Sequence, residues 1–139
     1  MPTTFVRVLV VDDFEPWRDY VRSALKTQPE LQVVGEASDG LEAVQKSQEL
    51  QPDLILLDIG LPTMNGIESA RRIKQLAPGA KILFASENSD VDVVRVALSD
   101  GARGYILKAD AGHELLPAIE AVLRGDRFVS KRLKREDSQ

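Results

Sequence analysis

Acidic, basic and hydroxyl side chains stand directly after short apolar runs in this chain. The residues in this position are Asp12 and Asp13, Asp58, Ser86, and Lys108. A short run that is apolar throughout, such as residues 54–57, is typical of a parallel strand covered on both faces. Because the carboxyl ends of parallel strands open into loops at one edge of the sheet, we expect these polar groups to converge in a crevice there.

The residue types in this set favour phosphoryl chemistry on a metal ion. Three carboxylates in one crevice repel one another and raise the pKa of at least one of them. A hard cation such as Mg²⁺ removes that conflict, since it prefers oxygen ligands and typically takes one or two carboxylates. Lys108 adds a fixed cation and Ser86 a hydroxyl donor. Together they describe a site for a phosphoryl group whose charge is neutralised by Mg²⁺ and an ammonium.

Each residue of the set also has an ordinary structural explanation. Asp58 and Ser86 could cap the helices that follow them, because Asp and Ser are common helix N-caps. The Asp12-Asp13 pair could form a turn, and Lys108 could lie in solvent. Against the capping role of Asp58, the next helical pattern begins only near Asn65. The whole set at predicted strand ends therefore favours a functional site.

Five predicted strands alternate with five predicted helices. The apolar runs lie at residues 5–11, 31–37, 54–57, 81–85 and 104–107, and helical periodicity separates them. This alternation predicts an α/β fold with a parallel sheet covered by helices on both faces. The fifth helix is expected to begin near Glu114, because Ala111-Gly112-His113 offers poor capping and Pro117 would then fall harmlessly in the first turn.

Composition indicates one domain. The chain has 139 residues, 43% hydrophobic and 29% charged, with no cysteine and a single histidine. These counts exclude disulfides and thiolate metal sites and make histidine-based catalysis an unattractive explanation. The apolar runs are far shorter than the roughly 20 residues that span a bilayer, and the first residues do not resemble a signal peptide. We expect a cytoplasmic protein with no membrane contact.

The end of the chain is basic, although the formal net charge is −4. Residues 126–139 lack hydrophobic periodicity and are interpreted as a linker or tail after a domain at residues 5–125. A basic tail can indicate nucleic-acid binding. A solvated tail or an inter-domain linker is the explanation that we favour.

The combined motifs resemble the receiver domain of two-component response regulators. The matching features are Asp12-Asp13, Asp58 with residues 61–66, Ser86, residues 100–108, and residues 115–119 up to Gly125. Their style is most similar to receivers that precede a LuxR/NarL-type helix-turn-helix output domain. The resemblance implies a CheY-like, flavodoxin-like fold: a three-layer doubly wound (βα)5 sandwich with a five-stranded parallel sheet in the order 2-1-3-4-5.

The resemblance also implies roles for the matching residues. Asp58 would accept a phosphoryl group from a sensor histidine kinase or a phosphotransfer protein, and Lys108 would pair with that group. Mg²⁺ would be held by Asp13, Asp58 and the backbone carbonyl of Gly60, with Asp12 holding a metal-bound water. Ser86 would move toward the phosphoryl group and Tyr105 would move inward behind it. Tyr105 could equally be an ordinary half-buried strand aromatic.

Two positions depart from the family pattern. Glu87 follows Ser86, where the family usually has a small residue, and could either affect the phosphoryl group or simply point to solvent. Gly60 has no side chain to shield an acyl phosphate. Phosphohydrolases of similar topology usually place a second Asp at this position, so Gly60 argues against turnover and favours a switch that is not an enzyme.

Three functions stay open from the sequence. The first is a phosphorylation-dependent switch, which would control transcription through an output domain that the chain does not contain or act alone by protein contact. The second is a Mg²⁺-dependent phosphohydrolase with Asp58 as nucleophile, and the third is a binding module that is never phosphorylated. A homodimer is considered as well, and contact with DNA is expected only through an output domain.

Overall fold

The computed structural model describes residues 4–137, in which strands and helices alternate along the chain. The strands are β1 (Val6–Val11), β2 (Leu31–Ala37), β3 (Leu54–Leu57), β4 (Lys81–Ser86), β5 (Gly104–Leu107) and β6 (Phe128–Val129). The helices are α1 (Glu15–Leu25), α2 (Gly40–Leu50), α3 (Gly66–Leu76), α4 (Val91–Ser99), α5 (Ala111–Leu123) and α6 (Lys131–Asp137), with a 3₁₀ turn, η1 (Lys108–Asp110), before α5. None of the helices in this part of the chain has the length and apolar character needed to cross a membrane.

All strands are parallel and form one sheet in the order β2-β1-β3-β4-β5-β6. The predicted order of the first five strands is confirmed. Val11 pairs with Leu57, so β1 and β3 end level, and Leu57 pairs with Phe84, so β4 continues two residues further in the same direction. The loops that follow them therefore open at the same edge of the sheet.

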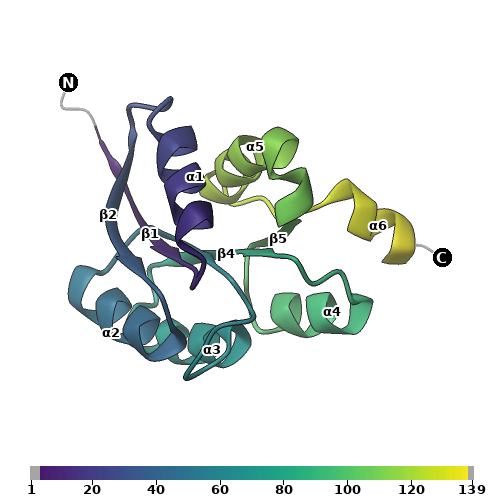
Figure 1. The fold of residues 1–139 in the computed structure, drawn as a ribbon, viewed down its shortest axis with the longest axis horizontal. Coiled ribbons are helices and arrows are strands. Elements are labelled where there is room, and N and C mark those ends of the chain that lie inside the picture. Colours follow the sequence, from purple (N-terminus) through teal and green to yellow (C-terminus); the bar gives the residue numbers. More distant parts are fainter. Residues whose placement is uncertain (1–3, 138–139) are drawn as a thin grey trace.

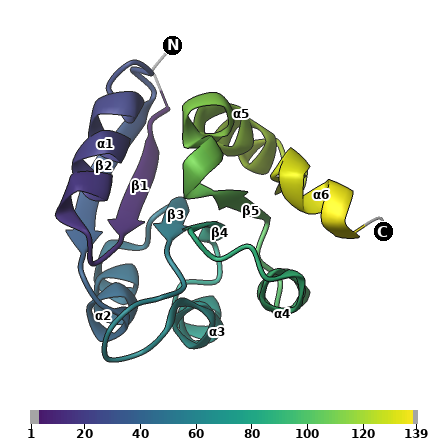
Figure 2. The same ribbon diagram turned by 45° about the vertical axis from the view of Figure 1, so that its right-hand side comes forward.

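Helices cover both faces of the sheet, because successive strand residues point to opposite sides. Val10 packs in a cluster with Val21 of α1 and Ile119 of α5, whereas Leu9 packs with residues of α2 and α3 such as Ile73. Figures 1 and 2 show α1 and α5 on one side and α2, α3 and α4 on the other. The predicted three-layer architecture is confirmed.

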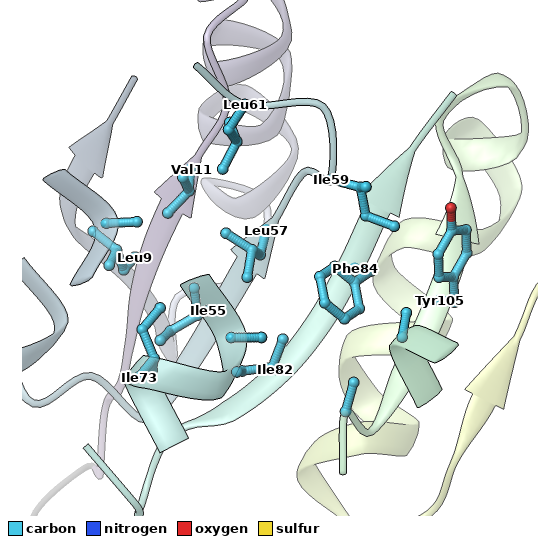
Figure 3. Packing of buried hydrophobic residues seen from close by; sticks show 14 of the residues in the cluster. Leu9, Val11, Ile55, Leu57, Ile59, Leu61, Ile73, Ile82, Phe84 and Tyr105 are labelled. Carbon is cyan, nitrogen blue, oxygen red and sulfur yellow. The ribbon is translucent and has the colours of Figure 1, made fainter. Parts of the chain in front are cut away.

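The core on the α2–α4 side extends to the end of the sheet where the strand-end carboxylates lie. Figure 3 shows Leu57, Ile59, Phe84 and Tyr105 in one cluster at this end. The rings of Phe84 and Tyr105 are 6.0 Å apart between centroids, a distance typical of interacting aromatic pairs. The prediction of Tyr105 as a merely half-buried residue is wrong, because its side chain is completely buried.

Residues 126–139, which the sequence interprets as a linker or tail, include a strand and a helix between residues 128 and 137. Phe128–Val129 add a sixth strand to the sheet, and Tyr105 pairs with Val129. Leu133 of α6 is buried against the core on the α4 side. Figure 2 shows α6, in yellow, beyond β5 and above α4. Residues 138–139 lie outside the described part of the chain.

A buried hydrogen-bond network attaches this C-terminal segment. The Ser130 hydroxyl donates to the Glu114 carboxylate and accepts from the Leu107 N–H at 2.9 Å. The other Glu114 oxygen accepts from the Lys131 N–H at 3.1 Å. Both Ser130 and Glu114 are buried. Burying a carboxylate is costly without hydrogen bonds, and this network supplies them.

The prediction that the fifth helix begins near Glu114 is also wrong. Helix α5 begins at Ala111, directly after η1, and Pro117 lies inside it on the exposed side. Proline in a helix interior costs roughly 3 kcal/mol. The buried residues of α5 on both sides of Pro117, including Leu115 and Ile119, offset this cost by packing against the sheet.

Candidate functional site

The loop after β3 presents Asp58 at the edge of the sheet. The Asp58 N–H donates to the Val11 carbonyl at 3.1 Å and continues the strand pairing by one residue. Gly66 begins α3 so close to this loop that a Cβ atom there would lie 2.0 Å from the Asp58 carbonyl oxygen. The Asn65 side chain caps α3 by accepting from the Glu68 N–H at 3.0 Å. Asn65, and not Asp58, therefore caps α3, so the alternative of a capping role for Asp58 is excluded and its carboxylate is left for other contacts.

Three carboxylates converge at this edge, as the sequence predicted. One ligand atom from each of Asp12, Asp13 and Asp58 lies within 4.8 Å of the others. Asp12 and Asp58 are buried, and Asp13 is exposed. The Asp12 Oδ1 accepts from the Phe14 N–H at 2.9 Å, which fixes its orientation. Asp13 is thus the solvent-exposed member of the cluster.

Lys108 reaches the same cluster from the end of β5. Its Nζ lies 2.6 Å from Asp12 Oδ2 and 3.7 Å from Asp58 Oδ2. The Lys108 side chain is only 13% exposed. Despite the short contact, Asp12 Oδ2 makes no hydrogen bond of acceptable geometry in the described part of the chain. A buried, incompletely satisfied carboxylate oxygen needs a further donor.

The electrostatics of Asp58 oppose its ionisation. Burial raises the pKa of Asp58 above its ordinary value, the Lys108 ammonium lowers that pKa, and the neighbouring Asp12 carboxylate raises it further. The net direction is upward. A divalent cation fits this environment, because the donors are all oxygen atoms and Asp12 Oδ2 can accept from a water on the ion.

Ser86 and Tyr105 contact the same loop behind the carboxylates. The Ser86 hydroxyl accepts from the Asn88 N–H at 3.0 Å, and the Tyr105 hydroxyl donates to the Asn88 carbonyl at 2.7 Å. Burial is the main reason that the pKa of Tyr105 is raised. Both side chains are thus connected through one residue, Asn88, which the sequence did not single out.

A hollow of about 350 Å³ opens above Asp58. The residues that line it are Asp13, Phe14, Asp58, Gly60, Glu87 and Lys108. The structure brings Gly60 and Glu87 to this hollow together with the predicted site residues, and Glu87 is exposed there. A Cβ atom on Gly60 would meet no atom within 4 Å, so the space above Asp58 is not limited by packing at this position.

Some residues around the site could not be predicted from the sequence. No motif marks Trp17 as a site residue, but the centroid of its ring lies 5.2 Å from Lys108 Nζ. Asn88 stands in a polar loop without periodicity. The local sequence identifies neither the contact of Trp17 with Lys108 nor that of Asn88 with Tyr105, because each joins separate elements of the chain.

A family model described as the response regulator receiver domain matches residues 8–120. Among curated proteins, the transcriptional regulatory protein LiaR of Bacillus subtilis is 38% identical over 121 residues, which are 87% of this chain and 57% of LiaR. The transcriptional regulatory protein DegU of Brevibacillus brevis is 34% identical over 124 residues, which are 89% of this chain and 52% of DegU. The chain thus spans little more than half the length of these relatives.

Solved structures resemble the fold along nearly its whole length. A LuxR-family two-component response regulator from Aurantimonas sp. SI85-9A1 has a TM-score of 0.90 and 34% identity, covering 96% of this chain and 95% of that one. The receiver domain of the putative response regulator NarL from Mycobacterium tuberculosis has a TM-score of 0.82 and 33% identity, with 88% and 98% coverage.

Proposed function

The chain belongs to the response regulator receiver family, and from that premise we propose that it is a signalling switch in which Asp58 accepts a phosphoryl group. The observation that carries the proposal is the convergence of three carboxylates and Lys108 at one edge of the sheet. The donor is a phosphohistidine on a sensor kinase or phosphotransfer protein.

The transfer forms an acyl phosphate. One Asp58 carboxylate oxygen attacks the phosphorus atom, the P–N bond to the donor imidazole breaks, and the imidazole takes up a proton from water. Asp13, Asp58 and the Gly60 carbonyl would hold Mg²⁺, with Asp12 acting through a water, and the bound ion would supply charge neutralisation in the transition state. Lys108 contributes a second cation, and it exchanges its contact with Asp12 for the phosphoryl oxygens.

The switch then acts through Asn88. The Ser86 hydroxyl turns from the Asn88 N–H to a phosphoryl oxygen, which removes one of the two hydrogen bonds that hold the Asn88 backbone. The Tyr105 hydroxyl either keeps its hydrogen bond to the Asn88 carbonyl or exchanges it for another acceptor. Couplings between two sites are typically about 1–3 kcal/mol, and one charge-assisted hydrogen bond can supply that amount.

We propose that the response to phosphorylation is carried out by a further domain of a longer protein. LiaR and DegU are named as transcriptional regulatory proteins and are nearly twice as long as the matched segment. The end of the chain, residues 126–139, leads to a DNA-binding output domain in this proposal. A single-domain receiver that acts through protein contacts, alone or as a homodimer, is the alternative.

Intact mass after incubation with acetyl phosphate and Mg²⁺ tests the proposal. We expect a base-labile addition of one phosphoryl group, which Asp58→Asn abolishes. Asp53→Asn, at the other end of β3, is the matched control and retains the addition. Rapid multiple turnover of acetyl phosphate would instead indicate a phosphohydrolase, and no addition would indicate a binding module.

A further inference from the structure

We propose that Trp17 is a positioning residue for Lys108. The proposal rests on the proposed phosphoryl transfer to Asp58 and names a residue of that site outside the carboxylate cluster. Lys108 Nζ lies over the Trp17 ring at 5.2 Å from its centroid. An ammonium within about 6 Å of an indole face is attracted by the ring quadrupole, and Trp is the strongest of the aromatic side chains in this respect.

Trp17 is held firmly enough to restrict the position of the Lys108 ammonium. It lies in the first turn of α1 next to Pro16, and its backbone N–H donates to the Phe14 carbonyl at 3.0 Å. Its ring is half-buried against the core between α1 and α5 and lies 5.4 Å from the Tyr20 ring. The indole can therefore define a position for a mobile ammonium.

The Lys108 side chain needs this restraint because it borders two hollows. One is the hollow above Asp58, and the other, of about 680 Å³, is lined by Phe14, Pro16, Trp17, Tyr20 and Lys108 among others. A lysine side chain has a long flexible stem. Asp12 and Asp58 attract its ammonium on one side, and the Trp17 ring keeps it from the wider hollow on the other.

This arrangement predicts a specific kinetic effect. In Trp17→Leu the ring face is lost while an apolar side chain remains, so we expect the rate constant of Asp58 phosphorylation by acetyl phosphate to fall about three- to tenfold. Trp17→Phe keeps a weaker face and should stay within about twofold of the unaltered protein. Because neither substitution touches a carboxylate, the Mg²⁺ affinity should change less than about twofold in both.

The fluorescence of Trp17 gives a readout that does not depend on phosphorylation. Trp17 is the single tryptophan of the chain, so all indole emission reports on it. Lys108→Met removes the ammonium from the ring and should change the emission intensity of the protein without Mg²⁺. Lys81→Met is the matched control, because Lys81 begins β4 at the opposite edge of the sheet and its Nζ donates to the Leu123 carbonyl. It should leave the emission unchanged.

The outcomes separate the two proposals. Failure of the unaltered protein to accept a phosphoryl group overturns the proposed function, whereas the emission comparison still tests the contact itself. If the unaltered protein is phosphorylated, a Trp17→Leu rate within a factor of about 1.5 overturns the positioning role, and so does an emission identical in Lys108→Met and the unaltered protein. If Trp17→Leu fails to fold, the comparison of emission between Lys108→Met and the unaltered protein decides.

Discussion

Replacing Ser130 by alanine tests whether the C-terminal segment is an integral part of the fold. The substitution leaves one Glu114 oxygen without its donor and the Leu107 N–H without its acceptor. Both groups are buried, and an unsatisfied buried group costs about 1–3 kcal/mol, more when it is charged. We expect the free energy of unfolding to fall by about 3 kcal/mol.

Urea unfolding followed by circular dichroism measures this change, provided that the transition is two-state. Ser99→Ala is the matched control, because the exposed Ser99 hydroxyl donates to the Val96 carbonyl within its own helix, α4. It should cost less than about 0.5 kcal/mol. A loss in Ser130→Ala no larger than that of Ser99→Ala would refute the stabilising role of the network.

A double substitution sharpens the test. Glu114→Met together with Ser130→Ala removes both partners of the shared hydrogen bond, so the combined loss should be smaller than the sum of the two single losses by at least about 1 kcal/mol. Additive losses would indicate that the two side chains act independently.

Three further predictions concern the site. Asp58→Asn should raise the free energy of unfolding at pH 7 without Mg²⁺, because burial raises the pKa of Asp58 and its ionisation therefore destabilises the folded state above the unfolded pKa. The advantage of the variant should shrink toward about pH 4, and a difference in urea unfolding that does not depend on pH would disprove this. Glu87→Ala should change the lifetime of the acyl phosphate, because Glu87 lines the hollow above Asp58. Intact mass follows phosphorylation and hydrolysis, and equal rates in the variant and the unaltered protein would contradict this. Gly66→Ala should cost more than about 2 kcal/mol in urea unfolding, because its Cβ would overlap the Asp58 carbonyl, whereas Gly79→Ala, where a Cβ meets nothing, should cost much less.

The sequence predicted the elements whose signals are local. The buried run Leu54–Leu57 predicted a central strand, and the carboxyl ends of β1, β3 and β5 at one edge of the sheet bring Asp12, Asp58 and Lys108 together as expected. Parallel pairing is sufficient to explain that convergence, since it places strand ends at one edge.

The elements that the sequence did not predict depend on distant partners. Strand β6 has only two residues, too short for any periodicity, and it exists because β5 offers a free edge. The start of α5 at Ala111 was missed because Glu114 is anchored by Ser130 and Lys131, which follow the helix in sequence. Likewise, the contact of Trp17 with Lys108 joins α1 to the end of β5.

The sixth strand also has a consequence for how this domain can be shortened. The family match ends at residue 120, and a chain cut near residue 125 would retain β5 but lose the strand that covers it. The exposed backbone of Gly104–Leu107 would then be an apolar edge strand, a template for pairing with other chains. We therefore expect such a truncation to self-associate more than the chain that retains β6 and α6.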